Sequence, residues 1–283
     1  MNRRGRSSKA LRVLAIILAI AVYYPASLSQ NRPVTPARAS SASSTASPRN
    51  PFSPGERLSY DVSWADFIIA AELNIDTDDR TTFDGVEGYH VTAQARTVGL
   101  VSGLALKVND VYESFINGAT LKPFRAEKRT RHGKKETRSS IIIEKNTGKL
   151  DTGRTLELPE ETYDLAGMLF AIRGMDLTIG KARTITLIED DKLYTVKVQP
   201  EGNEKITTRA GTYDTVRVAT SMVKGRENDK LYNLRIFITT DARRIPVLIT
   251  AEPSWGSVRV ELTSVSGVAK PNRTNLSATT DRE

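Results

Sequence analysis

The stretch Arg57-Leu58-Ser59-Tyr60-Asp61-Val62-Ser63-Trp64 alternates large apolar residues with small or charged ones. Side chains of a β-strand point to opposite faces in turn, so this period of two predicts a strand with one buried and one solvated face. The same alternation returns in residues 89–95, 194–198, 234–238 and 258–262. The denser apolar runs from Phe67 to Ile75 and from Ile141 to Ile143 are expected to be strands buried on both faces.

Turn signals separate these segments at short intervals. Asp84-Gly85 and Asn117-Gly118 supply the positive φ angles that tight hairpins need, and His132-Gly133 is a further turn. Many short strands joined by hairpins predict a mainly β protein. We expect an antiparallel curved sheet, or a barrel or half-barrel, in which neighbouring strands are mostly consecutive in the chain.

One segment has the period of a helix instead. Apolar residues recur there at positions i, i+3, i+4 and i+7, namely Leu165, Met168, Leu169 and Ile172. Thr162 or Asp164 is suited to cap its start, and Gly174 is suited to end it. We expect a single amphipathic helix packed on the sheet as part of the core. A lid over an apolar cavity is the functional alternative, with the following residues near the cavity: Trp64, Phe67, Met168, Leu169 and Phe170.

The N-terminal segment has the composition of an export signal. A basic head is followed by 12 apolar residues from Val13 to Tyr24, and small residues follow Pro25. A membrane-spanning helix needs roughly 20 apolar residues, so residues 1–29 are interpreted as a signal peptide, cut after Ser27 or Ser29 or later at Ala39. The protein is then periplasmic or otherwise exported. The alternative is an uncleaved segment that holds it at the inner membrane.

The rest of the chain divides by composition. Residues 30–51 are rich in Ser, Ala and Pro and are expected to form a disordered linker, and residues 269–283 a disordered tail. Residues 52–268 form a single β-rich domain. The chain has no cysteine, so disulfides, thiol chemistry and a lipoprotein anchor are excluded.

The charge distribution argues against nucleic-acid binding. The chain has 41 Lys+Arg and 33 Asp+Glu, and residues 1–51 contain eight of the basic residues and no acid. Residues 52–283 therefore hold 33 of each and carry no net charge. The high isoelectric point reflects the export signal and linker rather than a nucleic-acid surface.

One segment of the domain is strongly basic. Residues 122–138 hold eight basic and two acidic residues around a predicted hairpin tip. Such a hairpin could contact anionic head groups or wall polymers through Arg125, Arg129, Arg131, Lys134 and Lys135. A solvated hairpin whose charges prevent edge-to-edge aggregation is the simpler interpretation.

No catalytic or metal-binding motif stands out. The two histidines, His90 and His132, lie in different predicted hairpins and are too few for a zinc site. No Gly-x-Ser-x-Gly elbow and no glycine-rich phosphate loop is present. A carboxylate-dependent hydrolase stays possible because acids are plentiful, and it would need two acids facing each other across a polar cleft. We expect no catalytic residues, no metal and no cofactor.

Several segments together resemble a known family. They are Gly55 to Trp64, Asp110 to Ser114, Tyr163 to Arg173, Gly211 to Val216 and Thr240 to Val247. The set resembles the exported bacterial proteins that carry domain of unknown function 3108, over nearly all of residues 52–268. That family has no established activity, so the resemblance implies no catalytic residues. The end of the domain, from Asp241 through Pro246 and Gly256, is also similar to the half-barrels of periplasmic lipoprotein carriers, which hold an apolar cavity under helices.

These observations predict a non-catalytic exported envelope protein that binds an apolar or amphipathic ligand such as a lipid. A structural or adaptor module for another envelope protein is the second hypothesis, and a hydrolase of cell-wall polymers is the third. The expected partner is an envelope lipid or an envelope protein. Membrane contact is expected only through the signal segment or the basic hairpin.

Overall fold

The computed structural model describes residues 50–64, 68–99, 107–224, 230–252 and 257–267. Strands dominate the part of the chain before the helix: β1 (Arg57–Trp64), β2 (Ile68–Thr77), β3 (Thr81–Phe83), β4 (Val86–Thr97), β5 (Val108–Asn117), β6 (Pro123–His132), β7 (Lys135–Glu144), β8 (Thr147–Leu150), β9 (Thr155–Glu157) and β10 (Thr162–Tyr163). The helix α3 (Leu165–Gly174) follows. The remaining strands are β11 (Arg183–Glu189), β12 (Lys192–Thr208), β13 (Gly211–Lys224), β14 (Lys230–Thr239), β15 (Pro246–Ala251) and β16 (Val258–Ser266).

All these strands belong to one sheet, whose order is β10-β11-β12-β13-β14-β15-β16-β1-β2-β4-β5-β6-β7-β8-β9, with β3 paired to β4 beside this path. Neighbours run antiparallel except β10 and β11, which are parallel. The first and last strands, β1 and β16, pair in the middle of the order. The ends of the order, β9 and β10, are not paired with each other, so the sheet is curved but not closed.

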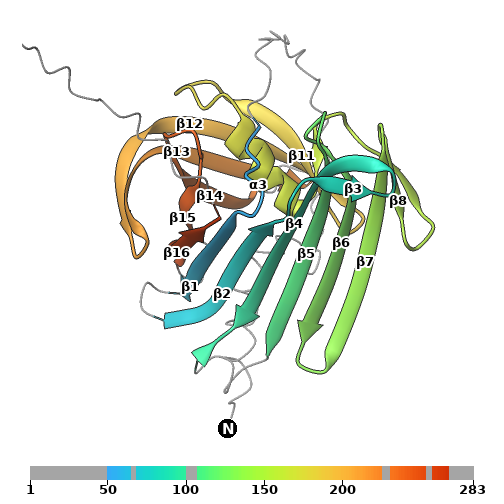
Figure 1. The fold of residues 1–283 in the computed structure, drawn as a ribbon, viewed down its shortest axis with the longest axis horizontal. Helices are drawn as coiled ribbons and strands as arrows, with labels where there is room; N and C mark the ends of the chain where they lie inside the picture. Colours follow the sequence, from blue (N-terminus) through green and yellow to red (C-terminus); the bar gives the residue numbers. More distant parts are fainter. Residues whose placement is uncertain (1–49, 65–67, 100–106, 225–229, 253–256, 268–283) are drawn as a thin grey trace, which may run out of the picture.

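The sheet curls around α3, which lies on its concave side (Figure 1). This arrangement confirms the predicted mainly β fold, with α3 packed on the sheet. It also corrects one detail, because the parallel pair β10–β11 was not expected. The chain crosses from one end of the sheet order to the other between β9 and β10, and α3 then connects β10 to β11, its parallel neighbour.

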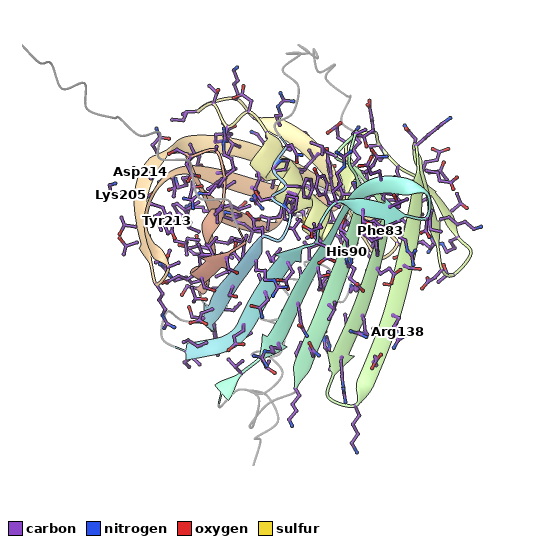
Figure 2. The ribbon with its side chains drawn as sticks, viewed as in Figure 1. Phe83, His90, Arg138, Lys205, Tyr213 and Asp214 are labelled. Carbon is purple, nitrogen blue, oxygen red and sulfur yellow. The ribbon has the colours of Figure 1, made fainter. Side chains whose placement is uncertain are left out.

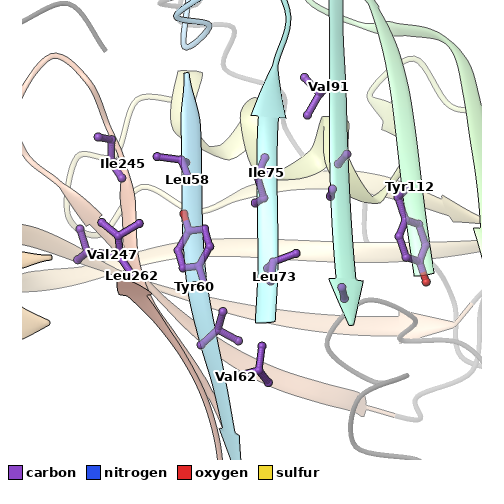
Figure 3. Close-up of a cluster of buried hydrophobic side chains, with 14 of the residues drawn as sticks. Leu58, Tyr60, Val62, Leu73, Ile75, Val91, Tyr112, Ile245, Val247 and Leu262 are labelled. Carbon is purple, nitrogen blue, oxygen red and sulfur yellow. The ribbon is translucent and has the colours of Figure 1, made fainter. Parts of the chain in front are cut away.

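The helix joins two apolar clusters. Ala166 and Phe170 pack into a cluster built by the strands around β1, β2 and β4, part of which is shown in Figure 3. Met168 and Ile172 pack into a second cluster built by β11 to β14. Residues two apart on a helix point in different directions, so one short helix fills the space between two halves of a curved sheet.

The predicted helix ends are confirmed in position. Asp164 is the N-cap residue, although its carboxylate makes no capping hydrogen bond, and the helix ends at Gly174. The Asp164 carboxylate accepts a hydrogen bond from the Ser114 hydroxyl of β5 at 2.7 Å instead.

A buried ion pair fixes the other end of α3. The Arg173 guanidinium donates to both carboxylate oxygens of Glu56, at 2.6 and 2.9 Å, and both side chains are almost fully buried. It also donates to the carbonyl oxygens of Arg243 and Arg244, each at 3.0 Å, in the turn between β14 and β15. The end of the helix is thereby bonded to Glu56, which is 117 positions away in the chain, and to two residues about 70 positions away.

The export signal, most of the linker and the tail lie outside the described residues, so these interpretations stay predictions. Within the described part of the chain, no helix has the length and hydropathy that a membrane span requires.

Candidate functional site

Three apolar side chains form a row at one end of the concave face. Trp64, at the end of β1, is directly opposite Ile68 of β2 and Val258 of β16. Directly opposite residues of antiparallel neighbours share a face of the sheet. Trp64 packs against the core cluster, so the row lies on the concave side. We call these three residues the apolar rim.

A β-bulge explains why Ile68 belongs to the rim. Val62 pairs with Ala71 and Ser63 pairs with Ile69, so Ala70 is an extra residue in β2. A bulge shifts the alternation of the strand by one residue and turns Ile68 to the side of Trp64. Ile68 is 49% exposed and Ile69 is 37% exposed. The expectation that this run is buried on both faces is therefore wrong at its beginning. It is also wrong for Ile141 to Ile143, because Ile142 is 48% exposed.

The rim carries an unpaired hydrogen-bond donor. The indole Nε1 of Trp64 is buried and has no hydrogen-bond partner among the described residues. A buried donor left unpaired costs about 1–3 kcal/mol. An exposed apolar side chain beside an unpaired N–H group suits a ligand that has both an apolar chain and an oxygen acceptor.

The other residues predicted to lie near a cavity are placed differently. Met168 and Phe170 are buried, each in a different core cluster, and Leu169 is partly buried against the first cluster. The Phe170 ring stacks on Phe52 with a centroid distance of 4.6 Å. Phe67 lies outside the described residues. Met168 and Phe170 are thus close in the sequence of α3 but pack into different clusters, whereas Trp64 lies at the rim.

Most of the predicted basic contact residues lie at the same end of the sheet as the rim. Strands β1, β4 and β6 run in one direction because each is separated from the next by a single antiparallel strand. The turn between β6 and β7 therefore lies at the end where β1 ends (Figure 1). Arg129, Arg131, Lys134 and Lys135 are all exposed there. We call these four residues the basic tip.

Within the basic tip two arginines lack an acidic partner. Among the described residues, neither Arg129 nor Arg131 forms an ion pair. Arg129 lies directly opposite Arg138 of β7, which is labelled in Figure 2, and Arg138 pairs with Glu136. Like charges directly opposite each other destabilise a sheet, so this surface favours an anionic contact.

Arg125 differs from the basic tip. It lies near the start of β6, at the opposite end of the sheet, and forms ion pairs with Asp84 and Glu127. Its guanidinium also lies over the Phe115 ring, 5.1 Å from the centroid. Hydrogen bonds from Arg125 to Asp84 and Glu127 raise its pKa. A contact with an anionic surface would have to replace these partners.

A buried polar cluster lies where the two ends of the sheet meet. The hairpin of β11 and β12 packs against β6, β7 and β8 through an apolar cluster of Ala126, Ile141, Leu150, Leu158 and Ile188. Beside it, the Lys128 ammonium of β6 forms ion pairs with Glu189 and with Asp190, the second at 3.1 Å. We call this contact the seam. At the seam the two ends of the sheet touch through side chains, and no backbone hydrogen bonds pair strand β9 with strand β10.

Burial shifts the pKa values of the carboxyl groups at the seam. It raises the pKa of Glu189 to about 7, although Lys128 acts in the opposite direction. It raises the pKa of Asp164 to about 6, against the hydrogen bond from Ser114. For Lys128, burial lowers the pKa, but the charges of Glu189 and Asp190 outweigh burial and the pKa is raised.

A pocket of about 50 Å³ opens at the seam. It is lined by Tyr112, Lys128, Asp164 and Glu189, among other residues. Pockets for small-molecule ligands usually measure about 300–1,000 Å³, and one water occupies about 30 Å³ in the liquid. This pocket has the volume of one or two waters, so a sugar ring of a wall polymer does not fit between its acids.

Sequence reasoning missed the seam. Lys128 was counted with the basic hairpin, although strict alternation places it on the same face as Ala126, away from Arg129. Glu189 stands beside the turn signal Asp190-Asp191 and had no signature of its own. The alternation of β6 was the available signal for Lys128, whereas only the curvature of the sheet brings Glu189 to it.

The two histidines do not meet, as the sequence predicted. His132 Nε2 lies 3.0 Å from the Asp110 carboxylate, and His90 Nδ1 lies 2.8 Å from the Asp78 carboxylate. His90 also stacks on Phe115 at 4.5 Å. Within the part of the chain that the structure describes, no group of three or more His, Cys, Asp or Glu residues is arranged to hold a metal ion.

Comparison with solved structures shows the fold in another protein. A beta-barrel-like protein of domain of unknown function DUF1849 from Brucella abortus is 16% identical, with a TM-score of 0.55, over 76% of this chain and 98% of that chain. A candidate lipoprotein from Parabacteroides distasonis is 10% identical, with a TM-score of 0.34, over 75% of this chain and 95% of that chain. A candidate exported protein with a YmcC-like fold from Bacteroides fragilis is 9% identical, with a TM-score of 0.31, over 75% and 96%.

No curated protein matches the chain. The likeness to the Brucella protein concerns the fold alone, because at this identity it carries no residue roles. The family model described as a protein of unknown function, DUF3108, matches residues 59–263. This match covers more than half of the sequence and confirms the family resemblance, and the chain belongs to the DUF3108 family.

Proposed function

We propose that this DUF3108 protein is a non-catalytic exported envelope protein that binds an amphipathic ligand, such as a lipid, at the apolar rim. The observation that carries the proposal is the buried, unpaired Trp64 N–H group next to the exposed Ile68 side chain. An ester or carboxyl oxygen of a lipid would satisfy the donor, while an acyl chain would cover Ile68. Both changes are favourable, because an unpaired buried donor and an exposed apolar surface each raise the free energy of the unbound protein.

The position of the basic tip supports an anionic head group. It lies at the same end of the sheet as the rim, and neither Arg129 nor Arg131 forms an ion pair among the described residues, although Glu136 lies directly opposite Arg131. Each Lys or Arg near an anionic membrane surface contributes about 1 kcal/mol of attraction. A lipid with its chain at the rim and its head group towards the basic tip would use both features.

Export is part of the same proposal. The basic head, short apolar run and small residues at the N-terminus have the order of a secretory signal. Ligands with acyl chains are abundant at the membranes that an exported protein meets. The pocket at the seam, with the volume of one or two waters, is too small for such a ligand.

The experiment compares lipid capture by matched variants. The full chain is purified, bound lipid is extracted with organic solvent and identified by mass spectrometry, and binding to phosphatidylglycerol and phosphatidylcholine vesicles is measured by sedimentation. Ile68→Asp removes the apolar side chain of the rim. Ile142→Asp is the control, because Ile142 of β7 is 48% exposed and Ile68 is 49% exposed.

We expect Ile68→Asp to lose lipid and vesicle binding, and Ile142→Asp to retain both. Trp64→Phe keeps the apolar ring and removes the donor, so it should weaken binding of ester lipids but not of a plain hydrocarbon probe. Absence of co-purified lipid together with absence of vesicle binding by the unaltered protein would reject the proposal. Equal binding by the two aspartate variants would show that the apolar rim is not the lipid-binding site.

A second candidate function is an adaptor that holds an anionic envelope partner through the basic tip. The directly opposed Arg129 and Arg138 favour it, because an anionic partner would relieve their repulsion. Arg129→Glu combined with Arg131→Glu should then reduce partner recovery in a pull-down. The control combines Lys145→Glu and Lys149→Glu, the same charge change on exposed side chains at the other end of the sheet. Equal recovery with both pairs would exclude the basic tip.

A further inference from the structure

The seam is the only described place where the two halves of the open sheet meet through a buried polar cluster on their outer strands. On one side stand β5, β6 and β7, and on the other stands the turn of the β11–β12 hairpin. A second ion pair, between Arg154 and Asp191 at 2.6 Å, joins the same turn to the segment between β8 and β9. The Arg154 and Asp191 side chains are exposed, so they add little to the contact.

Acidic groups outnumber basic groups inside the seam. Asp164 and Glu189 are 7% and 5% exposed, and Asp190 is partly buried beside them. Lys128 is the one cation that pairs with this group among the described residues, and it contacts Glu189 and Asp190 but not Asp164. Glu189 shares the ammonium group of Lys128 with Asp190, and Asp164 forms no ion pair among the described residues. Keeping both Glu189 and Asp164 ionised in this buried place is therefore costly.

A third buried group at the pocket has an unused hydrogen-bonding capacity. The Tyr112 side chain is 3% exposed and lines the pocket, and its hydroxyl has no hydrogen-bond partner among the described residues. The Lys128 ammonium lies 5.6 Å from the centroid of the Tyr112 ring. The site therefore contains a buried hydroxyl and room for one or two waters next to the two carboxyl groups.

We propose that the seam is a proton-binding site, and that release of a proton from Glu189 or Asp164 loosens the contact between the β11–β12 hairpin and β5–β7. Closure holds both carboxyl groups away from water, and burial favours their neutral forms. At Glu189 this effect and the charge of Asp190 outweigh the opposing effect of Lys128. Opening exposes them to water, where the charged form is favoured. Opening and proton release are therefore one coupled equilibrium.

The direction of the pH effect follows from the shifted groups. The pKa of Glu189 in the folded protein is about 7, above the ordinary 4.5, and that of Asp164 is about 6, above the ordinary 3.8. The closed state thus binds more protons than the open state between the ordinary and the raised values. Raising the pH through this window favours opening, by up to tenfold per pH unit for each carboxyl group.

Several other titratable groups surround Glu189, and they come from each neighbouring element. Strands β5 and β6 contribute Asp110, Tyr112, Glu127 and Lys128. The hairpin turn contributes Asp190 and Asp191, the segment after β8 contributes Arg154, and the start of α3 contributes Asp164. The charges of Glu189 and Asp110 raise the pKa of Tyr112 further after burial, so its hydroxyl stays neutral through the window. The charge of Asp190 raises the pKa of Glu189, and Lys128 lowers it without cancelling the effect of burial.

The test measures opening and protonation separately on the full chain. Hydrogen exchange with mass spectrometry gives protection factors for the β11–β12 turn between pH 5 and 8, after correction for intrinsic exchange. Strands β13 and β14 serve as the internal reference. Carboxyl ¹³C chemical shifts titrate Glu189 and Asp164 in the unaltered protein.

We expect protection of the turn to fall at least tenfold between pH 5 and 8 relative to β13 and β14. Glu189→Gln keeps the neutral form at every pH and should flatten most of this dependence, and Asp164→Asn should flatten the rest. Glu136→Gln is the control, because Glu136 is an exposed acid of β7 that pairs with the exposed Arg138. It should leave the profile unchanged.

Two results would overturn the proposal. One is a flat protection profile in the unaltered protein. The other is titration of both carboxyl groups below pH 5, which needs no variant and decides the matter even if Glu189→Gln fails to fold. The lipid-binding measurements at the rim are independent of both results, because the rim and the seam share no residue.

Discussion

Replacing Arg173 with methionine tests how α3 is held inside the sheet. The guanidinium makes four hydrogen bonds, two to Glu56 and two to backbone carbonyl oxygens between β14 and β15. Methionine has a similar length and can fill much of the space, but it has no donor. The change therefore isolates the polar contribution from the packing contribution.

The magnitude follows from what stays behind. In the variant the Glu56 carboxylate, 1% exposed in the folded protein, has lost its buried cation. Removal of one member of a buried ion pair costs about 3–5 kcal/mol, because the remaining charge is uncompensated. The two carbonyl oxygens also lose their donor. We expect the free energy of unfolding to fall by about 4 kcal/mol, which is ~8–16 °C in Tm for a domain of this size.

Equilibrium unfolding in urea, followed by circular dichroism, measures the loss. The control is Lys205→Met, which breaks the pair between Lys205 and Asp214 that is labelled in Figure 2. Both of its side chains are about two-thirds exposed, so its loss should cost less than about 1 kcal/mol. The double variant Arg173→Met with Glu56→Leu removes both buried charges and should be more stable than Arg173→Met alone.

Two outcomes would contradict this reasoning. If Arg173→Met lost less than about 1 kcal/mol, the pair would not be held away from water as the structure shows. If the double variant lost the sum of the two single losses, the two side chains would not be coupled.

Three further changes should have measurable effects. Phe170→Ala removes a stacked ring from the main core cluster and should cost about 3–5 kcal/mol in urea unfolding, and an unchanged midpoint would contradict its burial. Gly88→Ala places a Cβ 2.0 Å from a carbonyl oxygen of β5 and should cost about 1–3 kcal/mol, whereas Gly202→Ala, with open space around it, should be close to neutral. The free energy of unfolding should fall as the pH rises from 5 to 7.5, because Glu189 and Asp164 have raised pKa values in the folded state, and a rise over this range would refute the assignment. The loss from Glu189 alone is about 3 kcal/mol at most.

Local sequence patterns were sufficient for the helix and for several of the longer strands, but not for short strands such as β9 and β10. The alternation in residues 57–64 appears as β1, and the spacing of Leu165, Met168 and Ile172 appears as α3 with Asp164 at its N-cap. These patterns depend on side chains two to four positions apart, so they can be read without knowing the rest of the fold. The family resemblance was visible for the same reason, since it rests on short segments.

The candidate site could be predicted only in part. Trp64 was named, but Ile68 reaches its side of the sheet only through a bulge that shifts β2 by one residue. That Trp64 Nε1 lacks a partner among the described residues has no local signature in the sequence. Arg129, Arg131, Lys134 and Lys135 were named as a charged group, and all four are exposed. Arg125 was grouped with them because composition does not show that Asp84 and Glu127 reach it.

The sequence by itself determined the β class, the helix at residues 165–174 and the neutral charge of the domain, because each depends on composition or on neighbours in the chain. Only the tertiary structure decided that Arg173 pairs with Glu56, 117 positions away, and that Lys128 meets Glu189, 61 positions away. A curved sheet brings distant strands to one place, and no local pattern records which residues meet there. Burial then sets the protonation of those residues, and with it the physical properties of the seam.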